Sequence, residues 1–142
     1  MTQEDKELLL KDLSGRLPYG VKVHTSLKPI CTIFSKPSIY STVVIDGAGE
    51  KVCNISDIKP YLFPLSSITE ELWRDFIKTA GYEMREEDCG RHTEIYYYDL
   101  VGHEKTLYPN YDAIDWLNSH HFDYRALIEK GLAIDATGLK IY

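Results

Sequence analysis

The chain has 142 residues and a formal net charge of −6 at pH 7, from 22 acidic and 16 basic side chains. One domain of this length, residues 1–142, buries a core without metals or disulfides, and 44% apolar with 27% charged residues is too balanced for a disordered chain. The acidic excess lies in residues 67–142, which carry 15 acidic and 8 basic side chains, against 7 and 8 in residues 1–66. Because such a surface repels phosphate backbones, direct nucleic-acid binding is disfavoured.

Two further features bear on the compartment. Met1 is followed by Thr-Gln-Glu-Asp-Lys rather than by a basic and then apolar leader, and no run of about eighteen apolar residues occurs. Cys31, Cys53 and Cys89 form an odd, widely spaced set without a CxxC pair. We therefore expect a cytoplasmic protein with reduced cysteines and no membrane contact.

The first element is expected to be a helix over about 4–14. Four leucines between positions 8 and 13 lie in a charged background at roughly helical spacing. The pattern stops before Gly15 and the turn Pro18-Tyr19-Gly20. This part of the chain therefore predicts one helix followed by a tight turn.

A small antiparallel sheet is expected next. The segments rich in β-branched residues are 21–25, 31–34, 39–46 and 47–55, and Asp46-Gly47 is a typical reversal between two strands. The following stretch, 57–67, contains two prolines, which remove backbone donors from a ladder. We therefore predict that it leaves the sheet.

A second helix is predicted over 68–80. Ser67 and Glu70 have the spacing of a capping box, and Gly81 is placed to end the helix. Its apolar residues repeat along one helical face: Ile68, Leu72, Phe76, Ile77 and Ala80.

The region 82–110 begins with a charged run and continues with an aromatic one. Residues 82–92 lack apolar periodicity and predict an exposed loop. "TEIYYYDLV" predicts a strand near 93–101, in which Tyr96 and Tyr98 face one side and Tyr97 the other. Packing against the core is the favoured role of these tyrosines, and stacking on a ligand is the alternative.

Two short helices are expected to form a corner near the C-terminal end. Asp112 and Asp123 are suitable N-caps, Phe122 and Leu127 occupy the positions of a hydrophobic staple, and Gly131 follows as a stop. Together these elements predict an α+β fold in which an N-terminal helix, a small antiparallel sheet, a middle helix and this helical corner surround one core.

The stretch "DWLNSHHFDY" raises the question of a metal or acid–base site. Winding 112–121 as a helix turns Ala113, Trp116, Leu117 and His120 inward, leaves His121 partly solvated and points Asn118 away from the core. Adjacent histidines diverge by about 100°, whereas two helical ligands of one ion are usually four residues apart. We therefore expect the pair to be structural, with no metal and no cofactor.

Three segments, "KDLSGRLPYGVKV", "DIKPYLFPLSSITEE" and "DWLNSHHFDYRALIEKGLA", resemble recurring blocks of a group of small uncharacterised proteins encoded by gut Bacteroidetes and their prophages. The resemblance covers both ends and the middle of the chain. It implies a bacterial cytoplasm and a role accessory to a phage or mobile element, and it brings no activity, cofactor or catalytic residue with it.

A non-enzymatic interaction protein is the leading hypothesis, because no catalytic motif is visible and the uneven charge would steer a basic protein partner. The expected binding residues lie in the acidic loop 82–92, and they are Glu83, Glu86, Glu87 and Asp88. Two alternatives stay open. One is a small metal-dependent enzyme that uses His92, His103, His120 or His121 with nearby carboxylates, and the other is a small-ligand binding module built on the tyrosine-rich segment.

Overall fold

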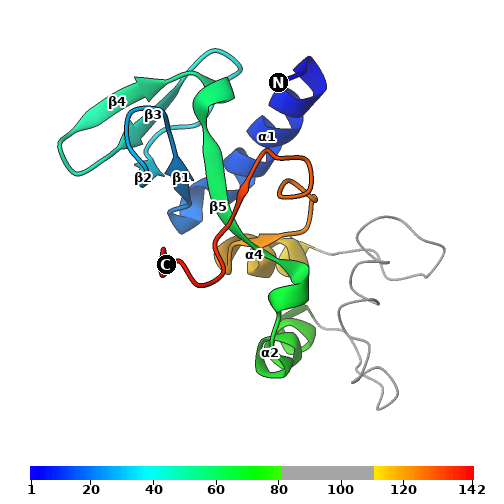
Figure 1. Cartoon of the computed structure of the whole chain (residues 1–142). Coiled ribbons are helices and arrows are strands. Elements are labelled where there is room, and N and C mark those ends of the chain that lie inside the picture. Colours follow the sequence, from blue (N-terminus) through cyan, green and yellow to red (C-terminus); the bar gives the residue numbers. More distant parts are fainter. Residues whose placement is uncertain (81–110) are drawn as a thin grey trace.

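The computed structural model describes residues 1–80 and 111–142, and it has the expected α+β fold, with helices and a mostly antiparallel sheet (Figure 1). The loop 82–92, the strand near 93–101 and the terminating Gly81 lie outside the described residues. No helix in the described ranges is both long and apolar enough to cross a membrane.

The N-terminal helix α1 spans Gln3–Arg16, slightly more than the expected range. It begins at a capping box, in which the Thr2 hydroxyl accepts the Asp5 amide and the Asp5 carboxylate accepts the Thr2 amide, both at 3.1 Å. A 3-10 turn, Leu17–Tyr19, follows, and Gly20 closes it at a φ of 65°, where a residue without a side chain is favoured. The predicted helix and turn are therefore confirmed.

Four short strands form the predicted antiparallel sheet. They are β1 (Lys22–His24), β2 (Cys31–Ile33), β3 (Thr42–Ile45) and β4 (Glu50–Cys53). The reversal at Asp46-Gly47 joins β3 to β4, with Gly47 at a φ of 88°. Among the described strands the order is β4-β3-β2-β1-β5-β6, which puts β4 at one edge, and the β3–β4 hairpin projects away from the helices (Figure 1).

The prediction that residues 57–67 leave the sheet is wrong for their central part. After a 3-10 turn at Ile55–Asp57, β5 spans Lys59–Pro64 and pairs antiparallel with β1 and parallel with β6 (Phe122–Asp123) and β7 (Ile134–Asp135). Each proline lies near a strand end, and a proline removes only its own donor. The Phe63 amide still donates to His121 O at 2.8 Å, and Leu62 O accepts the Ala136 amide at 2.8 Å.

Helix α2 spans Glu70–Ala80 and is confirmed, but its expected capping box is wrong. Ser67 ends a 3-10 turn, Leu65–Ser67, and its hydroxyl donates to Pro64 O at 2.7 Å. Thr69 takes the capping position instead, because its hydroxyl accepts the Leu72 amide at 3.3 Å. Glu70 is therefore free to pair with Arg74 one turn later, at 2.6 Å.

Only one helix of the predicted C-terminal corner forms. Helix α4 spans Tyr111–Ser119, so Asp112 lies inside its first turn rather than at its cap. Residues 124–131 form successive turns instead of a second helix. Asp123 does accept the amides of Leu127 and Ile128, at 2.9 and 2.8 Å, but Ala126 has a φ of 57°, and this left-handed residue interrupts any helix.

The buried apolar side chains of the described residues form two clusters rather than one core. The first lies beneath β1–β4 and includes Leu9 and Leu13 of α1, and the second joins α2 and α4 through Phe76 and Trp116. Phe122 belongs to the second cluster and Leu127 to the first, so the predicted staple between them is also wrong. Strand β5 serves both clusters, because successive side chains of a strand point to opposite faces: Leu62 lies in the first, and Phe63 packs on the second.

Candidate functional site

The two adjacent histidines take the opposite roles to those expected. His121 is buried, with 8% of its surface exposed, and its ring stacks on Tyr142 with centroids 3.6 Å apart. His120 is only partly buried and stacks on Trp116 at 3.9 Å. The helical projection fails here because α4 ends at Ser119 and His121 has a φ of 61°, which turns its side chain back into the molecule.

The surroundings of His121 favour a neutral ring. Burial first, and then the positive charge of Arg16, lower the pKa of His121 to about 4, with smaller contributions from His120 and Lys22. Its Nδ1 has no hydrogen-bond partner among the described residues. In residues 1–80 and 111–142, no three His, Cys, Asp or Glu side chains are grouped so that they could hold a metal ion.

The lowered pKa of His121 predicts a pH-dependent stability. Between about pH 6.5 and pH 4 the unfolded chain protonates His121 and the folded chain does not, so the unfolded state gains the extra proton. Above pH 6.5 His121 is neutral in both states and does not lower the free energy of unfolding. Acidification to pH 4 is expected to lower that free energy by on the order of 2 kcal/mol through this group. Urea unfolding at closely spaced pH values measures the effect. In His121→Gln the slope over this window should flatten, and an unchanged slope would contradict the assignment.

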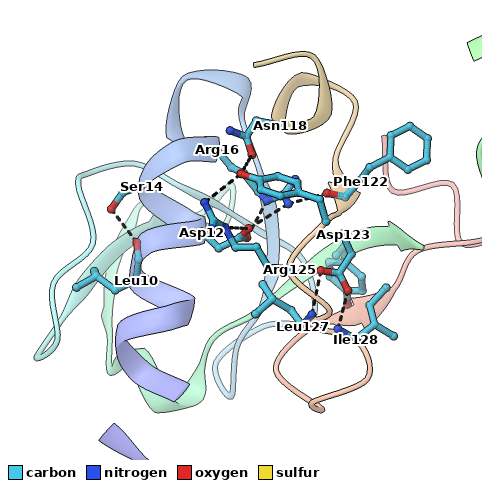
Figure 2. Close-up of polar contacts among 12 residues, drawn as sticks. Leu10, Asp12, Ser14, Arg16, Asn118, Phe122, Asp123, Arg125, Leu127 and Ile128 are labelled. Carbon is cyan, nitrogen blue, oxygen red and sulfur yellow. Dashed lines mark hydrogen bonds and ion pairs between the residues drawn. The ribbon is translucent and has the colours of Figure 1, made fainter. Parts of the chain in front are cut away.

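A charged cluster lies between α1 and the chain that follows α4 (Figure 2). Asp12 and Arg16 stand one turn apart on α1, and both side chains are fully buried. Arg16 Nε and Nη2 donate to the Asp12 carboxylate at 2.7 and 3.1 Å, and Nη2 also donates to Phe122 O at 2.7 Å. Arg125, which is 22% exposed, brings a second positive charge to within 3.4 Å of Asp12.

Tyr124 completes this cluster from the C-terminal side. Its ring lies 5.3 Å from the Arg16 guanidinium and 4.8 Å from that of Arg125, and its hydroxyl donates to Asn118 Oδ1 at 3.0 Å. Asn118 is buried, contrary to the prediction that it faces away. Helices α1 and α4 approach each other closely at this point. A Cβ added at Gly15 of α1 would lie only 3.2 Å from Nδ2 of Asn118 on α4.

The charged cluster ties α1 to the C-terminal part of the chain. Asp12 is engaged by two arginines, and Arg16 is held by a carboxylate and a carbonyl, so their charges are directed at each other and not at a solvent-accessible ligand. Asp12 and Arg16 are four residues apart, and this spacing of an acidic and a basic residue on one helix face is visible in the sequence. What it could not reveal is that the pair is buried, since most pairs at this spacing lie on a solvated helix face.

A second region of interest is the outer sheet face, the side of β1–β4 opposite the buried Val23, Ile33 and Val44. In an antiparallel ladder, directly paired residues share a face. Ile45 pairs with Thr32, and both lie on the outer side, where Ile45 is 37% exposed. Val52 of β4 also lies on this side and is 68% exposed.

Exposed apolar side chains continue from this face into the adjoining loops. Phe34, which directly follows β2, is 55% exposed, and Tyr40 in the β2–β3 loop is 85% exposed. Leu27 and Ile30 in the β1–β2 loop are 59% and 46% exposed. Of the ten large apolar side chains that are exposed among the described residues, six therefore lie on these strands or in their loops. Exposed apolar side chains that gather in one region are typical of a contact surface.

The free edge of β4 is less suited to binding than the face. Lys51 pairs with the buried Val44, so it lies on the inner side of the sheet at its rim. A charged residue that points inward on an edge strand disfavours the addition of another strand, because pairing would bury the charge. A partner is therefore better accommodated over the face than along the edge.

The binding residues expected from the sequence, Glu83, Glu86, Glu87 and Asp88, lie outside the described residues, as do His92, His103 and the three tyrosines at 96–98. The outer sheet face was missed by the sequence reading. The consecutive apolar residues in "TVVI" and "EKVC" could have indicated it, because successive residues of a strand point to opposite faces, and a sheet with one buried face needs apolar residues on only one of them.

No protein-family model, no curated protein and no solved structure matches this chain.

Proposed function

We propose that this protein acts by protein–protein contact through its outer sheet face rather than by catalysis. The observation that carries the proposal is the exposure of Val52, which is 68% exposed on a strand that pairs with β3 along its whole length. Full burial of a valine side chain contributes roughly 1.5–3 kcal/mol. A partner that covers Val52 would therefore gain binding free energy from removing this side chain from water. In the setting that the sequence resemblance implies, such binding would be accessory to a phage or mobile element.

The charges around the outer sheet face support contact with protein. Lys22 and Glu50 both lie on this side of the sheet, and Lys28 and Lys36 are in the loops at its two ends. A centre of apolar side chains with a charged rim is the usual composition of a protein-binding surface. The charged cluster at Asp12 and Arg16, by contrast, is fully buried and offers a partner no access.

Site-specific photo-crosslinking tests the proposal. A photoreactive phenylalanine analogue replaces Val52 in one variant and Tyr111 in the other, and each is illuminated in bacterial cells that express the full chain. Tyr111 is the matched control, because it is 92% exposed and lies at the start of α4, away from the β3–β4 hairpin (Figure 1). We expect a discrete covalent adduct from position 52 and none from position 111.

The identity of the adduct is read by mass spectrometry. A discrete adduct from position 52, with any protein, supports binding through the outer sheet face. The absence of an adduct from this position, or equal adducts from both positions, would contradict the proposed function.

A further inference from the structure

We propose that the outer sheet face binds a second copy of this chain, in a two-fold, face-to-face dimer. This inference rests on the proposed function and names the partner. It is carried by a row of four side chains that crosses the sheet with opposite charges at its two ends.

The row follows from the strand pairing. Lys22 pairs with Thr32, Thr32 with Ile45, and Ile45 with Glu50, so the four residues lie side by side on β1, β2, β3 and β4. Because neighbouring strands are about 4.8 Å apart, Lys22 and Glu50 are separated by roughly 14 Å. From β1 to β4 the row is therefore basic, polar, apolar and acidic.

Both terminal charges are available to a partner. Within residues 1–80 and 111–142, the ion pairs involve only Asp12, Arg16, Glu70, Arg74 and Arg125. Lys22 Nζ donates to Thr32 Oγ1 at 2.8 Å, which holds the ammonium over the face and leaves two of its three N–H groups. Glu50 is exposed and accepts no hydrogen bond from the described residues through its side chain.

The charge pattern selects one of two ways to stack two such faces about a two-fold axis. An axis that runs across the strands places β1 over β1 and β4 over β4 of the second copy. Lys22 then faces Lys22 and Glu50 faces Glu50, so like charges repel. An axis parallel to the strands, between β2 and β3, places β1 over β4 of the second copy. Lys22 then faces Glu50 of the second copy twice, and Thr32 faces Ile45 twice, as an isologous interface requires.

The apolar side chains fit the same arrangement. Val52 and Phe34 each lie two residues beyond the charged row, on the same side of it, and are 68% and 55% exposed, so stacking removes both from water. Four strands of three or four residues cover an area of roughly 19 by 10–13 Å, which is smaller than a standard stable interface. We therefore expect a weak dimer, which forms only at high protein concentration.

Charge reversal with mixing tests this arrangement. The full chain and the variants Lys22→Glu and Glu50→Lys are examined by sedimentation velocity from about 10 µM to 1 mM at low salt, where surface charge pairs are least screened. The wild type should dimerise, and each variant alone should lose at least tenfold in affinity, because both of its contacts then join like charges. An equimolar mixture of the two variants should recover the wild-type affinity, since every contact again joins opposite charges.

The mixture also protects the test against misfolding, because a variant that failed to fold would not recover affinity with the other. Circular dichroism of each variant confirms the fold, and Lys11→Glu, which makes the same charge change at an exposed position of α1, the helix that packs against the opposite face of the sheet, should dimerise as the wild type does. A chain that stays monomeric to 1 mM, or a mixture no tighter than the single variants, would overturn the dimer. If position 52 then crosslinks to a different protein, the proposed function stands without it, and if position 52 crosslinks to nothing, both fail.

Discussion

Replacing Asp12 by alanine is expected to lower the free energy of unfolding by about 3–5 kcal/mol, because it leaves the Arg16 guanidinium buried without its counter-charge. Both side chains of the pair are fully buried, so water cannot take over the role of the carboxylate. The substitution also removes the charge that Arg125 approaches at 3.4 Å, which adds repulsion between two arginines. Chemical denaturation of the variant and the wild type under identical conditions measures the difference.

A double-mutant cycle separates the interaction energy between Asp12 and Arg16 from the packing that each substitution removes. Arg16→Met keeps much of the side-chain volume and removes the charge, so the double variant Asp12→Ala/Arg16→Met leaves neither of these two buried charges without its partner. We expect the double variant to be more stable than the sum of the single losses predicts, by about 2 kcal/mol. Arg125→Met, at a partly exposed and more distant partner, should cost only about 1 kcal/mol. Additive losses in the cycle would show that Asp12 and Arg16 do not act as a pair.

The second large effect is expected at Trp116. Trp116→Ala should destabilise the protein by about 3–5 kcal/mol, as truncation of a buried aromatic side chain does. The indole is 5% exposed and stacks parallel to Phe122 with centroids 5.7 Å apart. Its Nε1 also donates to Asp75 Oδ2 at 2.7 Å, so the substitution removes a link between α4 and α2 as well as the packing.

Two companion variants make the Trp116 result specific. Trp116→Phe keeps an aromatic ring but lacks the donor to Asp75, and we expect it to lose about 1–2 kcal/mol. Tyr111→Ala, at a 92% exposed position of the same helix, should change stability by less than about 0.5 kcal/mol. Thermal unfolding followed by near-ultraviolet circular dichroism compares the three. Losses of equal size at positions 116 and 111 would mean that the second hydrophobic cluster contributes little to stability.

Local sequence patterns were sufficient where the physical signal is itself local. The leucine spacing predicted α1, the β-branched segments and Asp46-Gly47 predicted the β1–β4 meander, and the apolar face of 68–80 predicted α2. In each case hydrogen bonds close within one element or between consecutive strands, so the residues that decide the structure are neighbours in the chain. The pattern in α4 likewise placed Ala113, Trp116 and Leu117 correctly in the interior.

Tertiary structure decided the features that depend on distant partners. Strand β5 tolerates its prolines because β6 and β7, more than fifty residues later, supply donors and acceptors for the residues between them. His121 is buried by its contact with Tyr142, and the Asp12–Arg16 pair is buried because Phe122 O and Tyr124 close over it. The row from Lys22 to Glu50 exists only once the strand register is fixed. Sequence by itself determined which segments become helices and strands, and pairing across the fold determined which side chains are buried and which are left exposed, because burial depends on what comes to lie opposite each residue.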